Sequence, residues 1–557
     1  MKPLNTIDID RDISTLRLSS KKLVNLSNKE LADLFQQCIN QIPSICDYWV
    51  EISAKYKRIS PDQAVVGEEW AGGPWLTVWG FKYLIKTLEQ YPNIDINLDN
   101  NYKKKDNTLK VFPTSTVEKL LYMGVEGHIK IRNNMNIQQF NEYRGFESRI
   151  NTKNPTTTLV LGAGNQSCIP LLDFAYHITT RRSPVILKLN PVNEYLKPVY
   201  ENMMSPFISR DFLRIVTGDK EIGNHLTNHN GISHIHLTGG YTTYENIVYG
   251  RVLEDSEKKS KSTKKTNTKS ISTELGNVTP FIIFPGKWSK SDINVQAKKI
   301  ATAKLQNAGF NCIAAQVVVL DKNWEQADQF IAKIKEIISE QETRYFYYPG
   351  SSERVDSFNK SYNTDLLSKD QCDVPYSSYT TNEDDEYYFG NEIWGGAIIF
   401  KFIESSSLKD YSQRATSFCN DTLWGNLGCS IIIKPNTEKK FSKEFQYMVD
   451  NLKYGTIAIN EWCALGFAIP SLPWGGYPGN KDTDIQSGQG YVHNSYLFES
   501  PLNGIVRTPF KPFLNIDPPW LITHKNSHKV LRNLTLYLAT NSKINLLKTF
   551  VHAVLSK

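Results

Sequence analysis

Residues 156–190, "TTTLVLGAGNQSCIPLLDFAYHITTRRSPVILKLN", alternate between strand and helix patterns. The apolar run at 156–165 ends in a glycine turn and predicts a strand, and residues 183–189 predict a second one. Between them, residues 168–180 have the pattern of a crossover helix. A strand, a helix and another strand in this order are typical of a βαβ unit in a parallel sheet, so we predict an α/β fold.

Two more strand patterns follow, at 212–218 and 232–240, and both end in glycine. The stretch after Gly240 predicts the start of a helix. Parallel sheets of this kind bind ligands at the carboxyl ends of their strands. The glycines at 162, 164, 218, 239 and 240 therefore lie where a nucleotide would bind, although tight turns explain this pattern equally well.

The composition is that of an ordinary globular protein. The 557 residues are 40% hydrophobic and 22% charged, which predicts two or three packed units. The net charge of +7 falls to +4 without the segment 254–270, which has six lysines and three acidic residues. We therefore expect no nucleic-acid binding. The N-terminus carries early acidic residues, and no apolar run approaches about 18 residues, so we predict a cytoplasmic protein with no membrane contact.

The ends of the chain and the lysine-rich segment have simple interpretations. Residues 28–42 have helical periodicity, and Trp70, Trp75 and Trp79 are expected to fill a core. The segment 254–270 is lysine-rich and lacks apolar periodicity, so we predict a solvated loop, with a targeting or partner-binding segment as the alternative. The histidine-rich stretch 225–236 shows no metal-ligand spacing, and we predict no metal.

The chain has eight cysteines without a CxxC pair, which predicts reduced thiols. "NAGFNCIAAQ" (307–316) places Cys312 between a helix predicted to reach about Gly309 and a strand at 312–320. Such a junction suits a nucleophile, with a buried structural cysteine as the alternative. Cys463 is interpreted as a structural thiol, with a place in a substrate pocket as the alternative. We interpret the others as buried structural thiols: Cys38, Cys46, Cys168, Cys372, Cys419 and Cys429.

Ordered motifs along residues 156–513 resemble those of the aldehyde dehydrogenase superfamily. "NAGFNCIAAQ" resembles the family's cysteine box, which implies that Cys312 is the nucleophile. "TELGN" resembles the Glu-Leu-Gly-Gly box, which implies that Glu274 is the general base. "LGAGNQ" replaces the usual Pro-Trp-Asn-Phe turn but supplies Asn165, whose amide would stabilise an oxyanion together with the Cys312 backbone N–H.

The same resemblance implies a set of cofactor-binding residues. Lys188 in "VILKLN" would hold the adenosine ribose, and "HLTGG" resembles the turn beside the cofactor phosphates. "NEIWGG" resembles the Glu-x-Phe-Gly-Pro box, with Glu392 on the nicotinamide ribose, while "GTIAIN" and "PWGGYPG…SGQG" resemble the closing blocks. With the glycine of the strand at 212–218, the cofactor-binding set is Lys188, Gly218, Thr238, Gly239, Gly240, Glu392 and Trp394.

Several positions depart from the family pattern. Gly240 replaces the serine of the phosphate turn, and Asn277 replaces the second glycine of the glutamate box. Pro191 stands where a ribose-binding glutamate often occurs, and Glu194 comes later, which leaves both NAD and NADP open as cofactors. The lysine-rich insertion and the segments outside 156–513 resemble a longer subgroup.

The resemblance implies three parts. Residues 1–280 would form an N-terminal helical part and a variant Rossmann nucleotide-binding domain, including the insertion at 254–270. Residues 281–490 would form an α/β catalytic domain. Residues 491–557 would form a C-terminal bridging arm and extension, in which the stretch 496–510 joins the subunits of a homodimer or homotetramer.

The expected function is NAD(P)-dependent oxidation of a small-molecule aldehyde to a carboxylic acid. The first alternative is a CoA-linked acylating aldehyde dehydrogenase or acyl-CoA reductase, against which Glu274 argues because CoA needs no water-activating base. The second is a catalytically silent binding or structural protein. The substrate pocket is expected to draw on residues 461–473 and the helix after Asn165, and the sequence does not identify the aldehyde.

Overall fold

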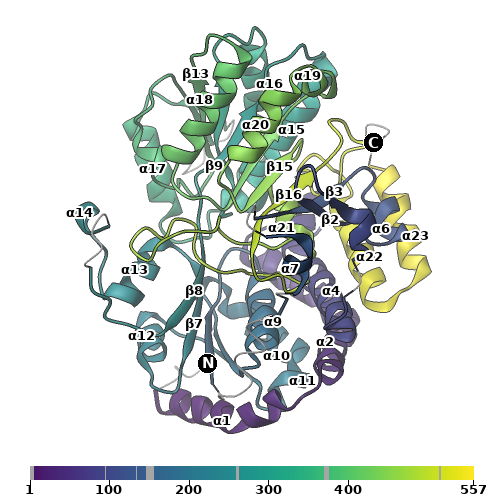
Figure 1. Ribbon diagram of the computed structural model, residues 1–557, viewed down its shortest axis with the longest axis vertical. Helices are drawn as coiled ribbons and strands as arrows, with labels where there is room; N and C mark the ends of the chain where they lie inside the picture. The colour runs from purple at the N-terminus through teal and green to yellow at the C-terminus, as the bar shows by residue number, and fades with distance from the viewer. Residues whose placement is uncertain are drawn as a thin grey trace.

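Two β-sheets organise the chain (Figure 1). The computed structural model describes residues 6–94, 96–132, 135–142, 144–145, 156–258, 263–368, 376–513 and 516–556. Cys372 and the middle of the lysine-rich segment lie outside these residues. Before that gap the segment forms a short helix, α14 (Asp255–Lys258), and after it the Lys265 ammonium pairs with Asp482. Every described helix is too short or too polar to span a bilayer.

The smaller sheet confirms the predicted α/β pattern. Its described strands are all parallel, in the order β6-β5-β4-β7-β8. Helix α9 (Ile169–Arg181) makes the predicted crossover from β4 to β5. The strands are β4 (Thr158–Leu161), β5 (Val185–Lys188), β6 (Leu213–Val216), β7 (His234–Gly239) and β8 (Ser270–Leu275). The helices after β5, β6 and β7 are α10 (Lys197–Met203), α11 (Ser205–Ile208), α12 (Lys220–Asn228) and α13 (Tyr241–Tyr249).

The larger sheet is mixed and has eleven strands among the described residues. The order is β1-β2-β3-β16-β15-β14-β9-β10-β13-β12-β11, parallel from β16 to β12 and antiparallel at both ends. The parallel strands are β9 (Thr279–Ile283), β10 (Ala315–Asp321), β12 (Ser377–Thr381), β13 (Ala397–Ile403), β14 (Gly428–Ile432), β15 (Thr456–Ile459) and β16 (Pro501–Arg507). The others are β1 (Tyr102–Lys103), β2 (Thr108–Phe112), β3 (Glu126–Ile131) and β11 (Asp365–Leu366).

Helices cover this sheet because its central strands are apolar on both faces, as in other parallel sheets. In Figure 1 they gather in the upper half of the molecule. They are α15 (Lys290–Leu305), α16 (Ala327–Ser339), α17 (Ser351–Ser361), α18 (Leu408–Asp421), α19 (Pro435–Lys440) and α20 (Ser442–Asn451).

The chain passes from the smaller to the larger sheet between β8 and β9, close to the predicted boundary at residue 280. Strands β1 to β3, from within the first predicted part, join the larger sheet through β16. The predicted arm at 496–510 contains β16, which pairs with β15 and β3 of its own chain. Its role in joining subunits stays a prediction, as does the division into three parts.

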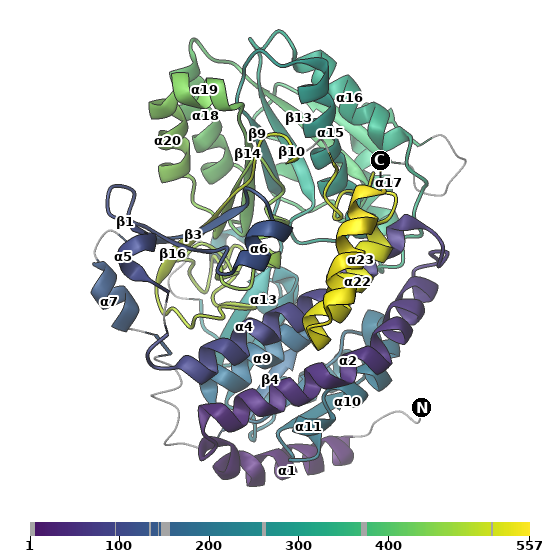
Figure 2. The ribbon, with the colours of Figure 1, turned by 90° about the vertical axis from the view of Figure 1, so that its right-hand side faces the viewer.

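The N- and C-terminal helices pack side by side (Figure 2). Helix α2 (Asn28–Tyr56) runs beyond the predicted residues 28–42, and α4 (Leu76–Gln90) packs against it. Between them lie η1 (Ala64–Val66), α3 (Gly67–Trp70) and a π-type turn, η2 (Ala71–Trp75). Trp70, Trp75 and Trp79 are buried, as predicted. Helix α22 (Ser527–Thr540) packs on α2, α3 and its neighbour α23 (Lys543–Val554).

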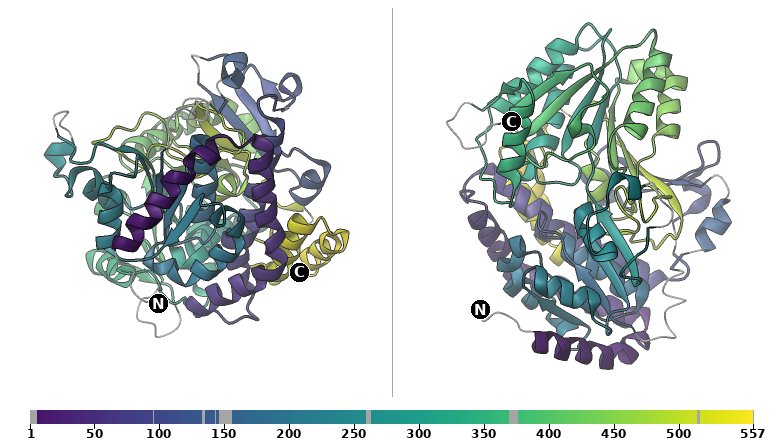
Figure 3. Two further views of the ribbon diagram at one scale, coloured as in Figure 1. Left: turned by 90° about the horizontal axis from the view of Figure 1, so that it is seen from below. Right: turned by 90° about the vertical axis from the view of Figure 1, so that its left-hand side faces the viewer.

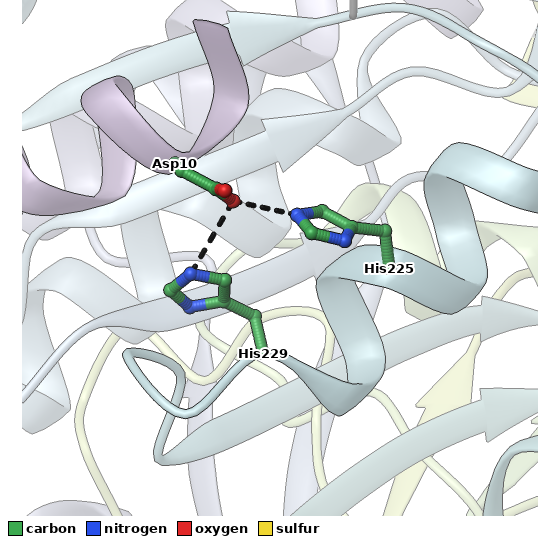
Figure 4. Close-up of side chains that lie close together, drawn as sticks. All are labelled: Asp10, His225 and His229. Atoms are coloured by element: carbon green, nitrogen blue, oxygen red, sulfur yellow. Dashed lines mark hydrogen bonds and ion pairs between the residues drawn. The ribbon is translucent and has the colours of Figure 1, made fainter. Parts of the chain in front are cut away.

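Helix α1 (Thr6–Val24) crosses the lower edge of the smaller sheet (Figure 3). Its Asp10 carboxylate lies 2.6 Å from His225 Nε2 and 3.4 Å from His229 Nε2 (Figure 4). Such a trio could ligate a metal. However, His229 Nδ1 accepts a hydrogen bond from the Gly231 N–H (2.9 Å), so Nε2 of the neutral ring carries the proton. The arrangement therefore fits a hydrogen-bonded link between α1 and α12.

Candidate active site

A left-handed turn presents Cys312. Helix α15 ends at Leu305 and not at about Gly309, because the backbone φ angles of Asn307 (55°), Ala308 (57°) and Gly309 (82°) are all positive. Only glycine adopts such angles without strain, and a Cβ on Gly309 would lie 2.6 Å from a backbone carbonyl oxygen. The turn reverses the chain and leaves Cys312 three residues before β10.

Charged residues of the N-terminal part hold this turn. The Asn307 side chain donates to the Asn165 carbonyl oxygen (3.0 Å) and accepts from Lys57 Nζ (2.9 Å). Lys57 in turn forms a buried ion pair with Glu69 (2.9 Å). The Asn307 backbone N–H donates to Glu68 (2.9 Å). These contacts fix the cysteine turn and the Asn165 turn against each other.

The contribution of the N-terminal part did not emerge from the sequence, although one signal for it was present. The glycine pair before Pro74 interrupts a helical pattern, which indicates close backbone approach. Gly72 indeed lies against the turn after β4, since its carbonyl oxygen accepts from the Cys168 N–H (2.8 Å). A Cβ on Gly72 would overlap the Gln166 amide oxygen at 1.8 Å.

The Cys312 thiol and the Glu274 carboxyl group are in contact. The thiol donates to Glu274 Oε1 over 3.5 Å, and the Trp474 indole N–H donates to the same oxygen over 3.0 Å. Burial raises the pKa of Glu274 to about 8. Burial, and next the charge of Glu274, raise the pKa of the Cys312 thiol well above its ordinary value. At neutral pH the thiol is therefore protonated and needs a base, and the carboxyl group titrates in the range where a base is useful.

Two cavities meet at Cys312. The larger has a volume of about 530 Å³ and the smaller, which is lined mainly by apolar side chains, about 120 Å³. Asn165, Ile169, Glu274 and Cys312 line both. The larger cavity brings together eight of the ten residues named from the sequence: Asn165, Thr238, Gly239, Gly240, Glu274, Cys312, Glu392 and Trp394. We call it the cofactor cavity and the smaller one the apolar cavity.

Glu392 fits closely against the strand that carries Glu274. Its carboxylate accepts from the Asn277 backbone N–H (3.1 Å), and a Cβ on Gly276 would lie 2.0 Å from it. Burial raises the pKa of Glu392 to about 7, against the opposing effects of the Asn277 hydrogen bond and of Arg354. The ring of Trp394 packs edge-on against Tyr348, with 5.4 Å between centroids.

The phosphate turn suits an anion. Helix α13 begins after Gly240, and no side chain caps its N-terminus. A Cβ on Gly240 would meet no atom within 4 Å, so the turn leaves open space beside the first backbone N–H groups. Backbone N–H groups at a helix N-terminus attract phosphate. Glu392 and Trp394 line the same cavity as this turn, so the cavity could hold a dinucleotide.

Lys188 and Gly218 lie outside the lining of the cofactor cavity but contact each other. The Lys188 ammonium donates to the carbonyl oxygens of Gly218 and Leu189 at the carboxyl ends of β5 and β6. The Gly218 N–H donates to Glu194 Oε1 (2.8 Å). Lys188, Gly218 and Glu194 thus form one cluster, which we call the strand-end cluster, where a parallel sheet binds the adenosine half of a dinucleotide.

The stretches expected to form a substrate pocket line the apolar cavity, while the role of that cavity stays a prediction. Glu461, Trp462, Ala464, Leu465, Phe467 and Ala468, all from the stretch 461–473, line the apolar cavity. Ile169 of the helix after Asn165 also lines it. Cys463 is fully buried and lines neither cavity, which favours the structural interpretation. Trp474, within a motif quoted for the resemblance, was not foreseen as the partner of Glu274.

Comparison with known proteins agrees with this architecture. Residues 207–343 match the sequence model of the aldehyde dehydrogenase family. No curated protein sequence matches the chain. Among solved structures, the aldehyde dehydrogenase of Mycobacterium tuberculosis complexed with NAD+ is 14% identical, with a TM-score of 0.60, covering 90% of this chain and 91% of that one.

Two further structures give the same result. A putative aldehyde dehydrogenase from Burkholderia cenocepacia is 14% identical, with a TM-score of 0.60 and coverage of 91% and 93%. Aldehyde dehydrogenase 21 of Physcomitrella patens, in complex with the reaction product succinate, is 13% identical, with a TM-score of 0.58 and 90% coverage of both chains. The resemblance drawn from the motifs is thereby confirmed: the chain has the aldehyde dehydrogenase fold, and residues 207–343 match that family's sequence model.

Proposed function

We propose that the protein oxidises an aldehyde to a carboxylic acid with NAD or NADP, through a covalent intermediate on Cys312. One observation carries the proposal: the Cys312 thiol contacts the Glu274 carboxyl group at the junction of the cofactor cavity and the apolar cavity. Solved structures of the same fold support the choice of cofactor, since those from Mycobacterium tuberculosis and Sinorhizobium meliloti are named as bound to NAD+ or as NAD-dependent.

The first step forms a bond between sulfur and carbon. Glu274 takes the thiol proton over the 3.5 Å contact, and the Cys312 thiolate attacks the aldehyde carbon. The carbonyl oxygen becomes an oxyanion, which the Asn165 side-chain amide and the Cys312 backbone N–H would stabilise. The hydrogen bond from the Asn307 side chain to the Asn165 carbonyl oxygen fixes the backbone of the turn that carries this amide.

The oxyanion then collapses to a thioester and expels hydride. When bound, NAD or NADP supplies the hydride acceptor, with Glu392 and Trp394 beside the nicotinamide half and the strand-end cluster beside the adenosine half. Glu274 then releases the thiol proton to solvent and takes a proton from water, whose oxygen attacks the thioester. The C–S bond breaks, the carboxylic acid leaves, and Glu274 returns the proton to the Cys312 sulfur, which restores the thiol. The Trp474 indole N–H orients the Glu274 carboxylate throughout.

The wider setting is also proposed. We place the enzyme in the cytoplasm, as a homodimer or homotetramer joined through the arm at 496–510. The Glu194 carboxylate in the strand-end cluster favours NAD over NADP, because it would repel a 2′-phosphate.

Replacing Glu274 by Gln tests the proposal. The amide keeps the size of the side chain but removes the base for both steps, so the first hydride transfer slows and the thioester hydrolyses slowly. We expect a slowed burst of reduced cofactor of at most about one equivalent per site and steady turnover about 10² to 10⁴-fold slower. Intact-mass measurement should find an acyl group on Cys312.

The alternatives predict different outcomes. Wild-type turnover that requires added CoA would favour the acylating or acyl-CoA-reducing activity. Unchanged steady-state turnover in the Gln variant would exclude Glu274 as the base. No reduction of either cofactor with any aldehyde would favour a binding or structural protein.

A further inference from the structure

The apolar cavity has walls from three distant parts of the chain. Beside the stretch 461–474 from the catalytic region, the N-terminal segment 64–76 and the C-terminal segment 519–531 line it. Helix α22 packs on α3 and η2, and its residues Ser527 and Leu531 form part of the cavity wall. A substrate carbon bonded to Cys312 would therefore direct its remaining atoms toward the N- and C-terminal segments.

A second apolar cavity adjoins the first. Its volume is about 250 Å³, and Trp75, Glu461, Pro519, Trp520 and Leu531 line both cavities. Beyond these shared residues the second cavity reaches α23 and the short helix α6 (Thr116–Leu121). We call it the outer cavity.

The outer cavity opens on an apolar rim. Four of its lining residues are large, hydrophobic and exposed: Leu120 (52%), Met123 (44%), Phe513 (59%) and Val554 (55%). Apolar side chains that gather around the mouth of a cavity commonly mark a binding site for an apolar ligand.

We infer that the substrate is a long-chain aliphatic aldehyde, whose chain runs from Cys312 through the apolar cavity, past Trp75, Trp520 and Leu531, into the outer cavity. The inference rests on the proposed function, since it takes the aldehyde carbon to Cys312. Each methylene buried along this path gains binding free energy, which favours long chains over short ones.

Apart from Glu274, the wall of the apolar cavity has two acidic residues, and both are compatible with such a chain. Glu461 accepts from the Trp462 backbone N–H (3.0 Å) and lies near the charge of Lys299, while Glu68 accepts from Arg344 (3.0 Å). One oxygen, Glu68 Oε1, is buried without a hydrogen bond, but burial raises the pKa of both Glu68 and Glu461 and so favours their neutral forms. The acids therefore do not require a cationic substrate.

The test is a series of saturated aldehydes from propanal to tetradecanal, with kcat/KM measured for each. We expect kcat/KM to rise roughly threefold to fourfold per methylene over the chain lengths that the two cavities enclose. Replacing Leu531 by Trp should block the passage to the outer cavity, which lowers the ratio of kcat/KM for dodecanal to kcat/KM for propanal at least about tenfold. A flat or falling profile beyond butanal would overturn the inference.

Helix α23 offers a matched pair of variants that should not disturb folding. Val554 lines the outer cavity and Val551 does not, and both are about half exposed on the same helix. Val554→Asp should lower kcat/KM for dodecanal about tenfold, whereas Val551→Asp should leave it within about twofold. Equal effects of both changes, together with dissociation of an oligomer, would identify the rim as a subunit interface and overturn the inference.

A binding measurement separates the inference from the proposed function. Saturated primary amides from propanamide to dodecanamide cannot be oxidised, and they should quench the fluorescence of the tryptophans in the wall more strongly as the chain lengthens. Binding of long amides that Leu531→Trp abolishes, without oxidation of any aldehyde, would leave the long-chain site intact and refute the proposed reaction. Oxidation of short aldehydes without any gain from chain length would refute the long-chain site alone.

Discussion

The two cavities that meet at Cys312 differ in how well the sequence predicts the residues of their walls. The residues that line the cofactor cavity lie within 163–424. Short sequence motifs predicted most of those that we expect to act on the cofactor. The apolar cavity takes half of its wall from segments 64–76 and 519–531, where no motif indicated a site. The difference teaches that sequence motifs can predict the residues proposed to carry out the chemistry, whereas they do not predict the residues proposed to bind the substrate.

The physical reason lies in what each wall must do. Hydride transfer and thioester hydrolysis need particular atoms at particular points, namely a thiol, a carboxylate and an amide, and few residue types supply them. An apolar wall needs only bulk and the exclusion of water, which Leu, Ile, Trp and Phe supply interchangeably. Its residues therefore look like core residues until the chain is folded.

The largest expected effect lies on Cys312, where the two cavities meet. Changing Cys312 to Ala should abolish aldehyde oxidation and leave cofactor binding nearly intact, because in the proposed mechanism the thiol would contact the substrate carbon and not the adenosine half of the cofactor. Steady-state turnover and cofactor titration measure the two effects. Cys463→Ala is the matched control, since Cys463 is fully buried and lines neither cavity. Measurable turnover in Cys312→Ala would remove the central claim.

The next effect isolates the cofactor cavity. A Cβ at Gly276 would lie 2.0 Å from the Glu392 carboxylate, so Gly276→Ala must displace Glu392. We expect the KM for NAD to rise at least about tenfold while aldehyde binding to the apolar cavity is retained. Gly504→Ala is the control, because its Cβ would make only ordinary contacts at 3.7 Å on the remote strand β16. An unchanged KM would mean that Glu392 does not contact the cofactor.

Much of the fold was also predictable, because local sequence patterns indicate it, as motifs indicated the cofactor cavity. The strands at 156–165, 183–189, 212–218 and 232–240 have buried apolar runs, which end in glycine in all but the second, and the structure confirms them. The helix end before Cys312 was misplaced by four residues, since the left-handed angles of Asn307 and Ala308 depend on contacts with Lys57 and Glu68. Those partners lie more than 200 residues away in the sequence, so the local periodicity could not indicate them.

A smaller effect is expected on the pH dependence of turnover, which we attribute to Glu274 in the wall of both cavities. Its pKa of about 8 predicts that turnover rises with pH through about 8 and then levels, because only the ionised carboxylate acts as a base. The Trp474 hydrogen bond lowers this pKa, so Trp474→Phe should move the midpoint to higher pH and slow turnover at pH 7.5.

The control for this shift is Trp324→Phe, which removes an indole N–H bonded to the remote Gly286 carbonyl oxygen. The pH dependence of kcat, measured for wild type and both variants, decides the outcome. A midpoint that stays in place, or moves to lower pH, in Trp474→Phe would contradict the assignment of the titration to Glu274.

The smallest expected effect concerns the far end of the cofactor. The Glu194 carboxylate accepts from the Gly218 N–H beside Lys188, where a 2′-phosphate of NADP would bring about two negative charges. Glu194→Gln keeps an oxygen acceptor for this N–H but removes the charge. We therefore expect kcat/KM with NADP to rise about tenfold, equivalent to ~1.4 kcal/mol, while kcat/KM with NAD changes no more than about threefold.

Glu201→Gln is the control variant for the change in overall charge. Glu201 lies on α10 and is half exposed, with only a loose ion pair to Lys197 at 3.6 Å. Both variants lose one negative charge, so a gain with NADP that appears in Glu194→Gln alone must arise locally. The gain should also shrink as ionic strength rises, because salt screens the repulsion. If the NADP-to-NAD ratio is the same in all three proteins, the strand-end cluster does not hold the adenosine ribose, and the cofactor must lie differently along the parallel sheet.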